Sequence, residues 1–322
     1  MLKDILDKKQ CFKLVCGCGN EDEKEVEKLV ALYSKAGCNF FDLCAKPEIV
    51  DAAKRGLEYA GIKEDRYLCV SVGIDGDPHT NKAVIDKALC IGCEMCKDVC
   101  PHDAIITKNG VCEVVQKRCI GCGHCIKECG SGEIKLKSIP QDLEEIMPPL
   151  IEKGIDCIEL HAIGEDEDEV DKKWKYLDSI FDGIMCISID RSKLGDEKLL
   201  ERVKRMLSIR KPYTTIVQAD GIAMSGSTND YRTTLQSIAI TEFFASKNLP
   251  AYIMSSGGTN AKATELAKLC GVPQNALAVG SYARKIVKEY VAREDFLTNQ
   301  EVFNKALETA KNLVETSLKN MG

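Results

Sequence analysis

The chain has 322 residues, 44% hydrophobic side chains and a formal net charge of −6, enough for one large core with a smaller attached domain. No apolar run approaches the roughly 20 residues of a membrane span, and the first residues lack a signal peptide's apolar segment, so we expect a cytoplasmic protein with no membrane partner. The acidic balance, densest at 165–169, argues against nucleic acid as a partner.

Eight short apolar runs alternate with segments that carry an apolar helical face, the pattern of parallel strands buried on both sides. We predict strands at 12–16, 39–43, 67–72, 157–160, 183–189, 214–219, 251–255 and 276–280. This α/β alternation is typical of a closed (β/α)8 TIM-type barrel. Without the cysteine-rich segment after the third strand, roughly 260 residues remain, close to the usual barrel size of about 250.

The pattern predicts three segments: the first part of the barrel at 1–77, a cluster domain at 78–139, and the second part of the barrel with a C-terminal helix at 140–322. The cluster domain leaves the carboxyl end of the third strand, which in barrel enzymes faces the active site, so we expect it on the rim of the mouth. Pro148 and Pro149 predict a break in the helix between Asp142 and Lys153. The amphipathic stretch at about 299–320 either closes the barrel bottom or packs on a second subunit.

Two cysteine runs carry the strongest functional signal. Three thiols separated by two residues can wrap one cubane, while the fourth, three residues further on, binds the other cluster. We therefore predict an inserted bacterial-ferredoxin-like domain with two [4Fe-4S] clusters. Cluster 1 is held by Cys90, Cys93, Cys96 and Cys129, and cluster 2 by Cys119, Cys122, Cys125 and Cys100. Gly130 stands where a second proline is expected, which leaves open whether cluster 1 has three or four irons.

Polar residues two apart close several predicted strands. We expect them to point into the barrel, because burial beneath the helices without partners would cost roughly 1 to 3 kcal/mol each. The pairs are Asp42 with Cys44, Glu159 with His161, Ser188 with Asp190, and Gln218 with Asp220. His161 and Asp220 are the candidate catalytic residues, since His161 can shuttle protons near neutral pH. The alternative is a structural histidine with satisfied hydrogen bonds.

Glycine-rich loops follow the seventh and eighth strands, where barrels commonly hold phosphates. The candidate residues for a phosphate or FMN are Gly257, Gly258, Thr259, Asn260, Gly280, Ser281 and Arg284. The alternative is that these glycines only make tight turns. Cys16, Cys18 and Cys44, at the ends of the first two strands, form either an extra metal or redox site or buried apolar positions.

Several segments resemble a known family. They are 15–17, 71–79, Gln218–Gly221 with Met224–Gly226, Gly257–Asn260 and Gly280–Arg284. Together with the cysteine runs, they make the chain similar, nearly end to end, to the light-dependent period (LdpA) iron-sulfur proteins of cyanobacteria. The resemblance implies iron-sulfur clusters and a role in reporting cellular redox state, in that family to the circadian clock. It implies no catalytic residues.

Two functions remain open. In the first, the protein transfers electrons or senses redox state, and its clusters communicate with a site at the barrel mouth and with a redox partner protein. In the second, it is an oxidoreductase whose clusters deliver electrons to a flavin or a phosphorylated ligand at the glycine loops, while His161 or Asp220 moves protons.

Overall fold

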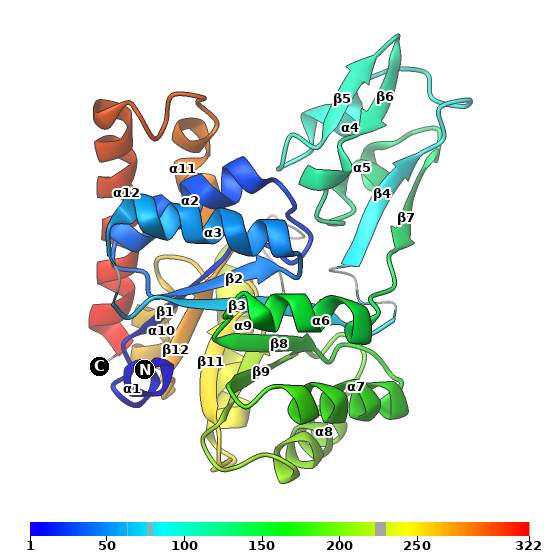
Figure 1. The fold of residues 1–322 in the computed structure, drawn as a ribbon. Helices are drawn as coiled ribbons and strands as arrows, with labels where there is room; N and C mark the ends of the chain where they lie inside the picture. Colours follow the sequence, from blue (N-terminus) through cyan, green and yellow to red (C-terminus); the bar gives the residue numbers. More distant parts are fainter. Residues whose placement is uncertain (63, 76, 78–79, 223–229, 322) are drawn as a thin grey trace.

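Eight parallel strands form a closed barrel in the order β1-β12-β11-β10-β9-β8-β3-β2 (Figure 1). This computed structural model describes residues 1–62, 64–75, 77, 80–222 and 230–321. The barrel strands are β1 (Cys11–Val15), β2 (Phe40–Cys44), β3 (Tyr67–Gly73), β8 (Cys157–His161), β9 (Ile184–Ile189), β10 (Thr215–Asp220), β11 (Tyr252–Ser256) and β12 (Ala276–Val279). Each strand bound lies within one residue of its predicted position, so the predicted barrel is confirmed.

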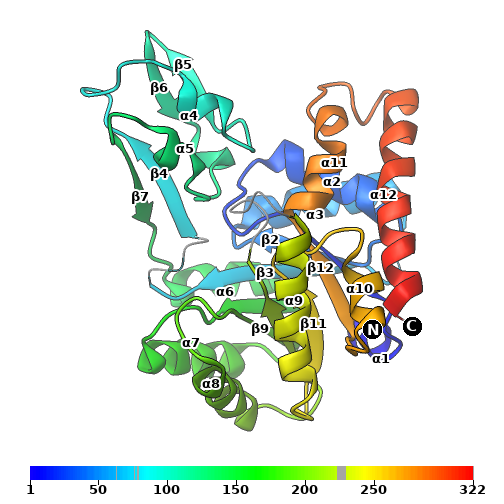
Figure 2. The same ribbon diagram turned by 180° about the vertical axis from the view of Figure 1, so that it is seen from behind.

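A helix on the outside of the barrel follows each strand, after the insert in the case of β3 (Figure 2). These helices are α2 (Glu23–Lys35), α3 (Pro47–Ala60), α6 (Leu143–Glu152), α7 (Glu167–Ile180), α8 (Asp196–Ser208), α9 (Asp230–Ala245), α10 (Ala263–Leu269) and α11 (Ser281–Val291). Their inward residues, such as Val30, Trp174 and Val287, join the strand residues in one continuous core. In the described part of the chain, no helix combines the length and apolar character needed to cross a bilayer.

The two prolines do not break α6, contrary to the prediction. Pro148 and Pro149 lie on the exposed side of an unbroken helix. Each proline removes one intrahelical hydrogen bond, but the carbonyls left without a donor belong to the exposed residues Glu144 and Glu145, where water can bind them. Packing of the opposite face holds the helix together. The buried residues of that face are Leu143, Met147 and Leu150.

A short helix that the sequence analysis did not identify, α1 (Leu2–Asp7), closes the bottom of the barrel. Its residues Leu2, Ile5 and Leu6 pack against strand residues including Cys69 and Cys157. Six residues are too few to show a helical period. The C-terminal helix, α12 (Gln300–Met321), does not close the barrel bottom: it packs alongside α2, α10 and α11 on the outside of the barrel and buries its apolar face within the chain (Figure 2).

Between β3 and α6 the chain forms an insert with two small antiparallel sheets. One pairs β4 (Asn81–Ile85) with β7 (Ile134–Ser138), and the other pairs β5 (Ile105–Lys108) with β6 (Val111–Val114). Its helices are α4 (Met95–Asp98), the 3-10 helix η2 (Gln116–Arg118) and α5 (His124–Glu128). Ala83, Ile105 and Ile134 join the cysteines in a separate small core. The predicted boundary at Pro78 and the segment Met224–Gly226 lie outside the described residues.

One buried ammonium group joins the insert to the barrel. Lys82, in β4, is 4% exposed, and its Nζ donates to the carbonyl of Gly19 at 2.6 Å. The same Nζ donates to the carbonyls of Gln116 at 2.9 Å and Cys119 at 2.8 Å within the insert. Glu21 pairs with it at 3.0 Å. Because Gly19 and Glu21 follow the carboxyl end of β1, the insert sits on the mouth side of the barrel.

Two further ion pairs flank this contact. Arg118 of the insert lies 3.1 Å from Asp22, which caps α2, and Lys288 of α11 lies 2.9 Å from Asp103 of the insert. The insert is therefore held against both the first and the last helix that follow the strands. These partly exposed pairs add less than the buried Lys82 contact, because water screens them.

Helices α2 and α3 cross at Gly56, where no side chain fits. A Cβ there would lie 2.5 Å from the carbonyl oxygen of Glu27 and 3.0 Å from the amide nitrogen of Ala31. We expect Gly56→Leu to lower the free energy of unfolding by about 3 kcal/mol in urea denaturation, because the helices must separate. Glu58→Leu places the same side chain on an exposed site of α3 and should change it by less than about 0.5 kcal/mol. Equal effects would contradict a tight crossing.

Lys82→Met keeps most of the apolar stem of Lys82 but removes the shared donor. Hydrogen bonds to a charged group contribute about 1.5 to 3 kcal/mol each, so we expect amide exchange at residues 17–22 to accelerate at least tenfold, measured by mass spectrometry. Lys87→Met removes an exposed lysine that pairs with Glu113 inside the insert, and should leave those residues unchanged. Unaltered exchange in Lys82→Met would show that this ammonium does not hold the insert in place.

Candidate functional site

The second cysteine run lies together with the last cysteine of the first run. Burial raises the pKa of Cys125 to about 11. The neighbouring thiolates that add to this increase are those of Cys122, Cys119 and Cys100. The same four cysteines line one small cavity in the insert, so their thiols lie together. They are the four residues assigned to cluster 2.

Thiols of both runs lie near Cys96 in α4. Burial raises the pKa of Cys96 to about 12, and Cys112, Cys125 and Cys129 raise it further. The division of these thiols between the two clusters stays a prediction. Cys112, which lies outside both cysteine runs, is buried and contacts Cys96. Its spacing gave no signal, because it reaches the cluster region from the separate strand β6.

Backbone amides point at several of these sulfur atoms. The three hydrogen bonds run from Ala83 N to Cys119 Sγ at 3.2 Å, from Ala104 N to Cys100 Sγ at 3.3 Å, and from Cys112 N to Cys90 Sγ at 3.4 Å. Such bonds favour the thiolate, which is the form that binds iron, and they help to set a cluster's reduction potential. Thiols with amide donors already aimed at them fit the ligand requirement of iron-sulfur clusters, and the assignment of four thiols to each cubane stays a prediction.

The turn that begins at Gly130 places hydrogen-bond donors around the thiol of Cys129. The Ser131 hydroxyl lies 3.5 Å from Cys129 Sγ. This hydroxyl, followed by the backbone amides of residues 131–133, lowers the pKa of Cys129 although burial opposes the effect. The turn after Cys129 therefore stabilises the thiolate without a proline. Whether cluster 1 holds three or four irons stays a prediction.

Inside the barrel, buried polar groups form a connected network around Lys13, a residue that the sequence analysis did not select. Lys13 is fully buried, forms an ion pair with Glu159, and lies 3.9 Å from Asp42. Its Nζ also donates to Gln218 Oε1 at 3.1 Å. A lysine in the middle of an apolar run gives no functional signal until the barrel closes and shows that it points inward.

His161 continues this network toward the mouth. Its Nδ1 lies 2.8 Å from Asp77 Oδ2 and its Nε2 lies 3.2 Å from Glu159 Oε1. Burial lowers the pKa of His161, but the two carboxylates outweigh that effect and raise it well above its usual value. The ring is therefore held as a cation that donates from both nitrogens. This geometry suits a structural or proton-donating histidine better than a general base.

Asp220 lies at the top of the network. Ser188 Oγ donates to it at 2.6 Å and Gln218 Nε2 at 3.2 Å. Burial, and then the charge of Glu159, raise the pKa of Asp220. Burial likewise raises the pKa of Asp42 to about 6, since Lys13 only partly offsets it. Glu159 differs, because Lys13 and His161 outweigh the effect of burial and lower its pKa.

Cys16, Cys18 and Cys44 are all buried, and an extra metal or redox site formed by them stays a prediction. Among the charges that act on these thiols, Cys44 has the largest effect on the pKa of Cys18 and Arg284 has the largest effect on the pKa of Cys16. Among the described residues, three potential ligand atoms lie within 4.8 Å of one another only at Asp42, Cys69 and Glu159. There the ammonium group of Lys13 already supplies the positive charge.

The loop Gly257–Asn260 is filled by neighbouring protein. A Cβ on Gly257 would lie 2.6 Å from the amide nitrogen of Gly221, and one on Gly258 would lie 2.5 Å from the carbonyl oxygen of Ile222. Asn260 Nδ2 donates to Thr234 Oγ1 at 2.8 Å, and Thr259 donates to the carbonyl of Ala278. The two glycines thus leave room for the backbone that follows β10. This arrangement agrees with the alternative in which the glycines only make tight turns. Gly280 is the residue immediately before α11.

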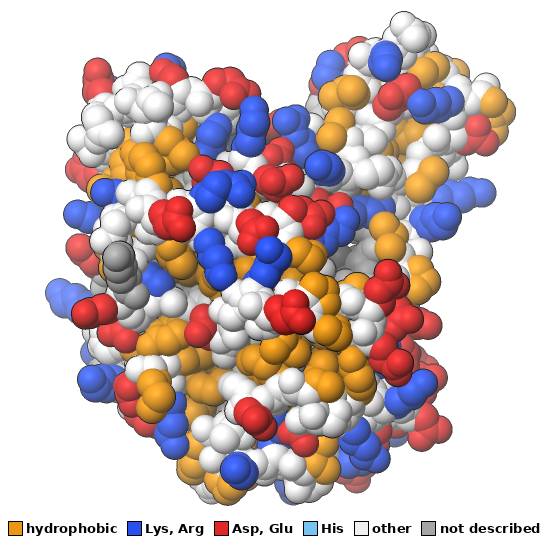
Figure 3. All heavy atoms as spheres, in the orientation of Figure 1, with side chains coloured by type: hydrophobic (Ala, Val, Ile, Leu, Met, Phe, Trp, Pro, Cys, Tyr) orange, Lys and Arg blue, Asp and Glu red, His pale blue; other side chains and the backbone are white. Residues whose placement is uncertain are grey.

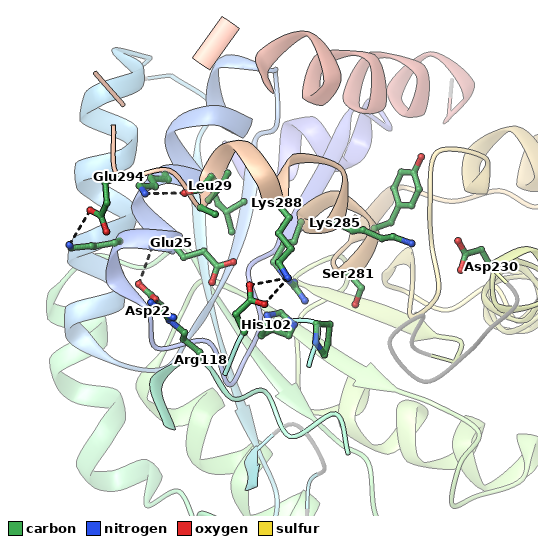
Figure 4. Close-up of a pocket in the computed structure, with 18 residues that line it drawn as sticks. Asp22, Glu25, Leu29, His102, Arg118, Asp230, Ser281, Lys285, Lys288 and Glu294 are labelled. Atoms are coloured by element: carbon green, nitrogen blue, oxygen red, sulfur yellow. Dashed lines mark hydrogen bonds and ion pairs between the residues drawn. The ribbon is translucent and has the colours of Figure 1, made fainter. Parts of the chain in front are cut away.

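Two residues of the predicted phosphate set, Ser281 and Arg284, instead line a cavity of about 790 Å³ (Figure 4). The cavity is enclosed by α2, by α11 with the residues that follow it, and by the insert. Lining residues include Glu25, Lys28 and Leu29 from α2, Lys285 and Lys288 from α11, and Pro101, His102 and Arg118 from the insert. Sequence reasoning could not find it, because its walls come from three distant segments.

The cavity lies beside a ligand of cluster 2, since Pro101 and His102 directly follow Cys100. Burial, then Arg284 and Lys288, lower the pKa of His102 to about 3. The neutral imidazole therefore adds no charge to this wall. Glu25 faces the same space, and burial raises its pKa although Arg284 and a hydrogen bond from Asn20 at 3.1 Å oppose that effect.

Two family models match the chain. The light dependent period A C-terminal domain matches residues 149–319, which is more than half of the chain, and the 4Fe-4S dicluster domain matches residues 82–130. The second match contains all eight predicted cluster cysteines.

Similar proteins support both matches. Light dependent period A of Synechococcus elongatus is 29% identical over 255 residues, covering 78% of this chain and 71% of that protein. An uncharacterised ferredoxin of Methanocaldococcus jannaschii is 33% identical over 97 residues, covering 27% of this chain and 64% of that protein. The crystal structure of the YdjI aldolase from Escherichia coli aligns with a TM-score of 0.51 at 7% identity, covering 100% of this chain and 94% of that one, and so shares the barrel fold alone.

The barrel, the paired thiol groups and the two matching family models lead to one conclusion: the chain belongs to the light dependent period A (LdpA) family and carries a 4Fe-4S dicluster domain.

Proposed function

We propose that this protein transfers electrons, or senses redox state, through two [4Fe-4S] clusters that connect a partner protein with the mouth of the barrel. The observation that carries the proposal is the contact made by Lys82, whose ammonium group binds the carbonyl of cluster ligand Cys119 and the barrel residue Gly19 together. A cluster domain fixed in this way offers electrons a constant path to the barrel. Bound clusters would supply one-electron chemistry, and the chain's own residues hold them at the mouth.

The two clusters differ in their surroundings. The loop that holds cluster 2 faces the barrel, where Ile120 approaches Gly17. In cluster 1, Gly92, between ligands Cys90 and Cys93, packs against Gly110 in the β5–β6 turn. Figures 1 and 2 show that hairpin at the end of the insert away from the barrel. Cluster 2 is thus the inner cluster and cluster 1 the outer one.

Apolar side chains are exposed around the outer cluster. Leu89 is 56% exposed, Ile91 76% and Met95 47%, and Cys93 itself is exposed. Apolar residues appear on the insert in the space-filling view (Figure 3). Exposed apolar groups beside a redox centre are suited to docking a protein partner. We infer that a redox partner exchanges electrons with cluster 1, and that cluster 2 passes them to or from the barrel.

A second candidate function is an oxidoreductase that uses a flavin or a phosphorylated substrate. The cavity beside Pro101 and His102 supports it, because a ligand there would lie against the loop that carries Cys100. The buried network supports it as well, since Asp220 holds a carboxyl of raised pKa at the mouth. In this function Asp220 exchanges protons, and His161 orients Glu159 and Asp77.

Protein purified without oxygen should contain about eight irons and eight acid-labile sulfides per chain. Cys93→Ser should remove about half of the iron and spare cluster 2, as measured by iron and sulfide assays and by electron paramagnetic resonance of the reduced protein. Cys270→Ser, which changes an exposed cysteine outside the insert, should retain all the iron. Zinc in place of iron, or an equal loss in both variants, would contradict the proposed centres.

The two candidate functions differ in flavin content. Acid precipitation of anaerobically purified protein, followed by fluorescence of the supernatant, should release about one flavin per chain if the protein is a flavin-dependent oxidoreductase. A carrier or sensor should release none while keeping its full iron content. Flavin bound in the absence of iron would exclude the carrier function, because no cluster would be present to accept electrons.

A further inference from the structure

We propose that the cavity between α2, α11 and the insert binds an organic phosphate ester of about mononucleotide size, with its phosphate at the amino end of α11. The role of this ligand rests on the second proposed function, the oxidoreductase. The inference adds where that oxidoreductase would bind its ligand. It moves the phosphate away from the filled Gly257–Asn260 loop to a space that the structure leaves open.

The amino end of α11 lacks a side-chain acceptor. This helix has eleven residues, and Gly280 before it provides no capping side chain. The first amides of a helix point outward without intrahelical partners, and the helix dipole adds positive potential there. Ser281, the first residue of α11, lines the cavity and offers a hydroxyl beside those amides. Phosphate groups bind at such ends.

Arg284 gives an independent indication of an anion. It lines the cavity, is 8% exposed, and donates one Nη1 hydrogen bond to the carbonyl of Val15. Its Nε is buried and has no hydrogen-bond partner. A Cβ on Gly280 would lie 3.5 Å from Nη1 of Arg284, so the guanidinium group lies at the amino end of α11. A buried guanidinium charge without an ion-pair partner costs free energy that a phosphate in the adjacent cavity would recover. No described residue forms an ion pair with Arg284 to fill that role.

The other cations around the cavity are mostly engaged. Lys288 pairs with Asp103, Arg118 with Asp22, and Lys24 with Glu294. Lys28 donates to the carbonyls of Val291 and Arg293. Lys285, next to Arg284, is exposed and forms no ion pair with a described residue. The uncommitted positive charge therefore lies at the amino end of α11, beside Ser281 (Figure 4).

The remainder of the cavity favours an ester over inorganic phosphate. Its volume of about 790 Å³ is far larger than one phosphate needs and lies in the range of small-molecule sites. Leu29, Val291 and Ala292 supply apolar lining, and Glu25 supplies a half-buried carboxyl group. A carboxylate repels a bare anion but accepts a hydrogen bond from an N–H or O–H group. A molecule with a phosphate at one end and a polar ring at the other matches both ends.

Isothermal titration of the anaerobically purified, full-length protein tests this proposal, with FMN, AMP and inorganic phosphate as separate probes. We expect FMN or AMP to bind more tightly than phosphate. Lys285→Ala, an exposed change that should leave the fold intact, should weaken that binding about tenfold, and Arg284→Gln should weaken it at least as much. Lys305→Ala removes one exposed lysine on α12 and should leave binding unchanged.

Failure to bind any probe would overturn the inference, as would binding that neither cavity variant weakens. Tighter binding of inorganic phosphate than of both esters would overturn the assignment of an ester. Iron content measured on the same samples separates this proposal from the proposed function. If the protein has its full iron content but binds no ligand, only the proposed ligand site is wrong. If protein without iron binds the ester and Lys285→Ala weakens that binding, only the proposed redox role is wrong.

Discussion

The functional arrangement of this protein depends on how one buried ammonium group is satisfied. Burying a lysine charge costs several kcal/mol unless acceptors surround it. Lys82 meets carbonyls from the insert and from the β1–α2 connection, together with the carboxylate of Glu21. Because the carbonyl acceptors belong to the backbone, the chain path itself sets the position of the insert. The inner cluster region is therefore fixed on the barrel rather than tethered beside it.

Along the axis of the barrel, apolar packing lies at the bottom and charged groups lie nearer the mouth. Its bottom is closed by apolar residues of α1 that pack against strand residues such as Cys69 and Cys157. Above them lie charged groups that compensate one another, with Lys13 beside Glu159 and Asp42. Such a network is costly to bury but holds its members in one geometry. The mouth can then present Asp220 and His161 on a rigid support.

The insert and the barrel together create a space that neither has alone. The barrel contributes α2 and α11, and the insert contributes the residues that follow the cluster ligand Cys100. The loop that carries Cys100 and the cavity thus share one wall, which is the basis for the ligand site that we propose. The exposed apolar residues Leu89, Ile91 and Met95 lie within and beside the first cysteine run. In the function that we propose, partner, clusters and cavity follow one another in that order.

Local signals were enough for the strands and the cluster cysteines, because an apolar run or a ligand spacing acts over a few neighbouring residues. The same local view misjudged Pro148 and Pro149, since their exposure depends on which helix face packs. It overlooked Lys13 and α1, and it placed the phosphate at glycines that turned out to be filled. By itself the sequence determined the barrel strands and the presence of a 4Fe-4S dicluster domain. Tertiary structure alone decided which groups face inward and where the cavity opens, because both depend on contacts between residues far apart in the chain.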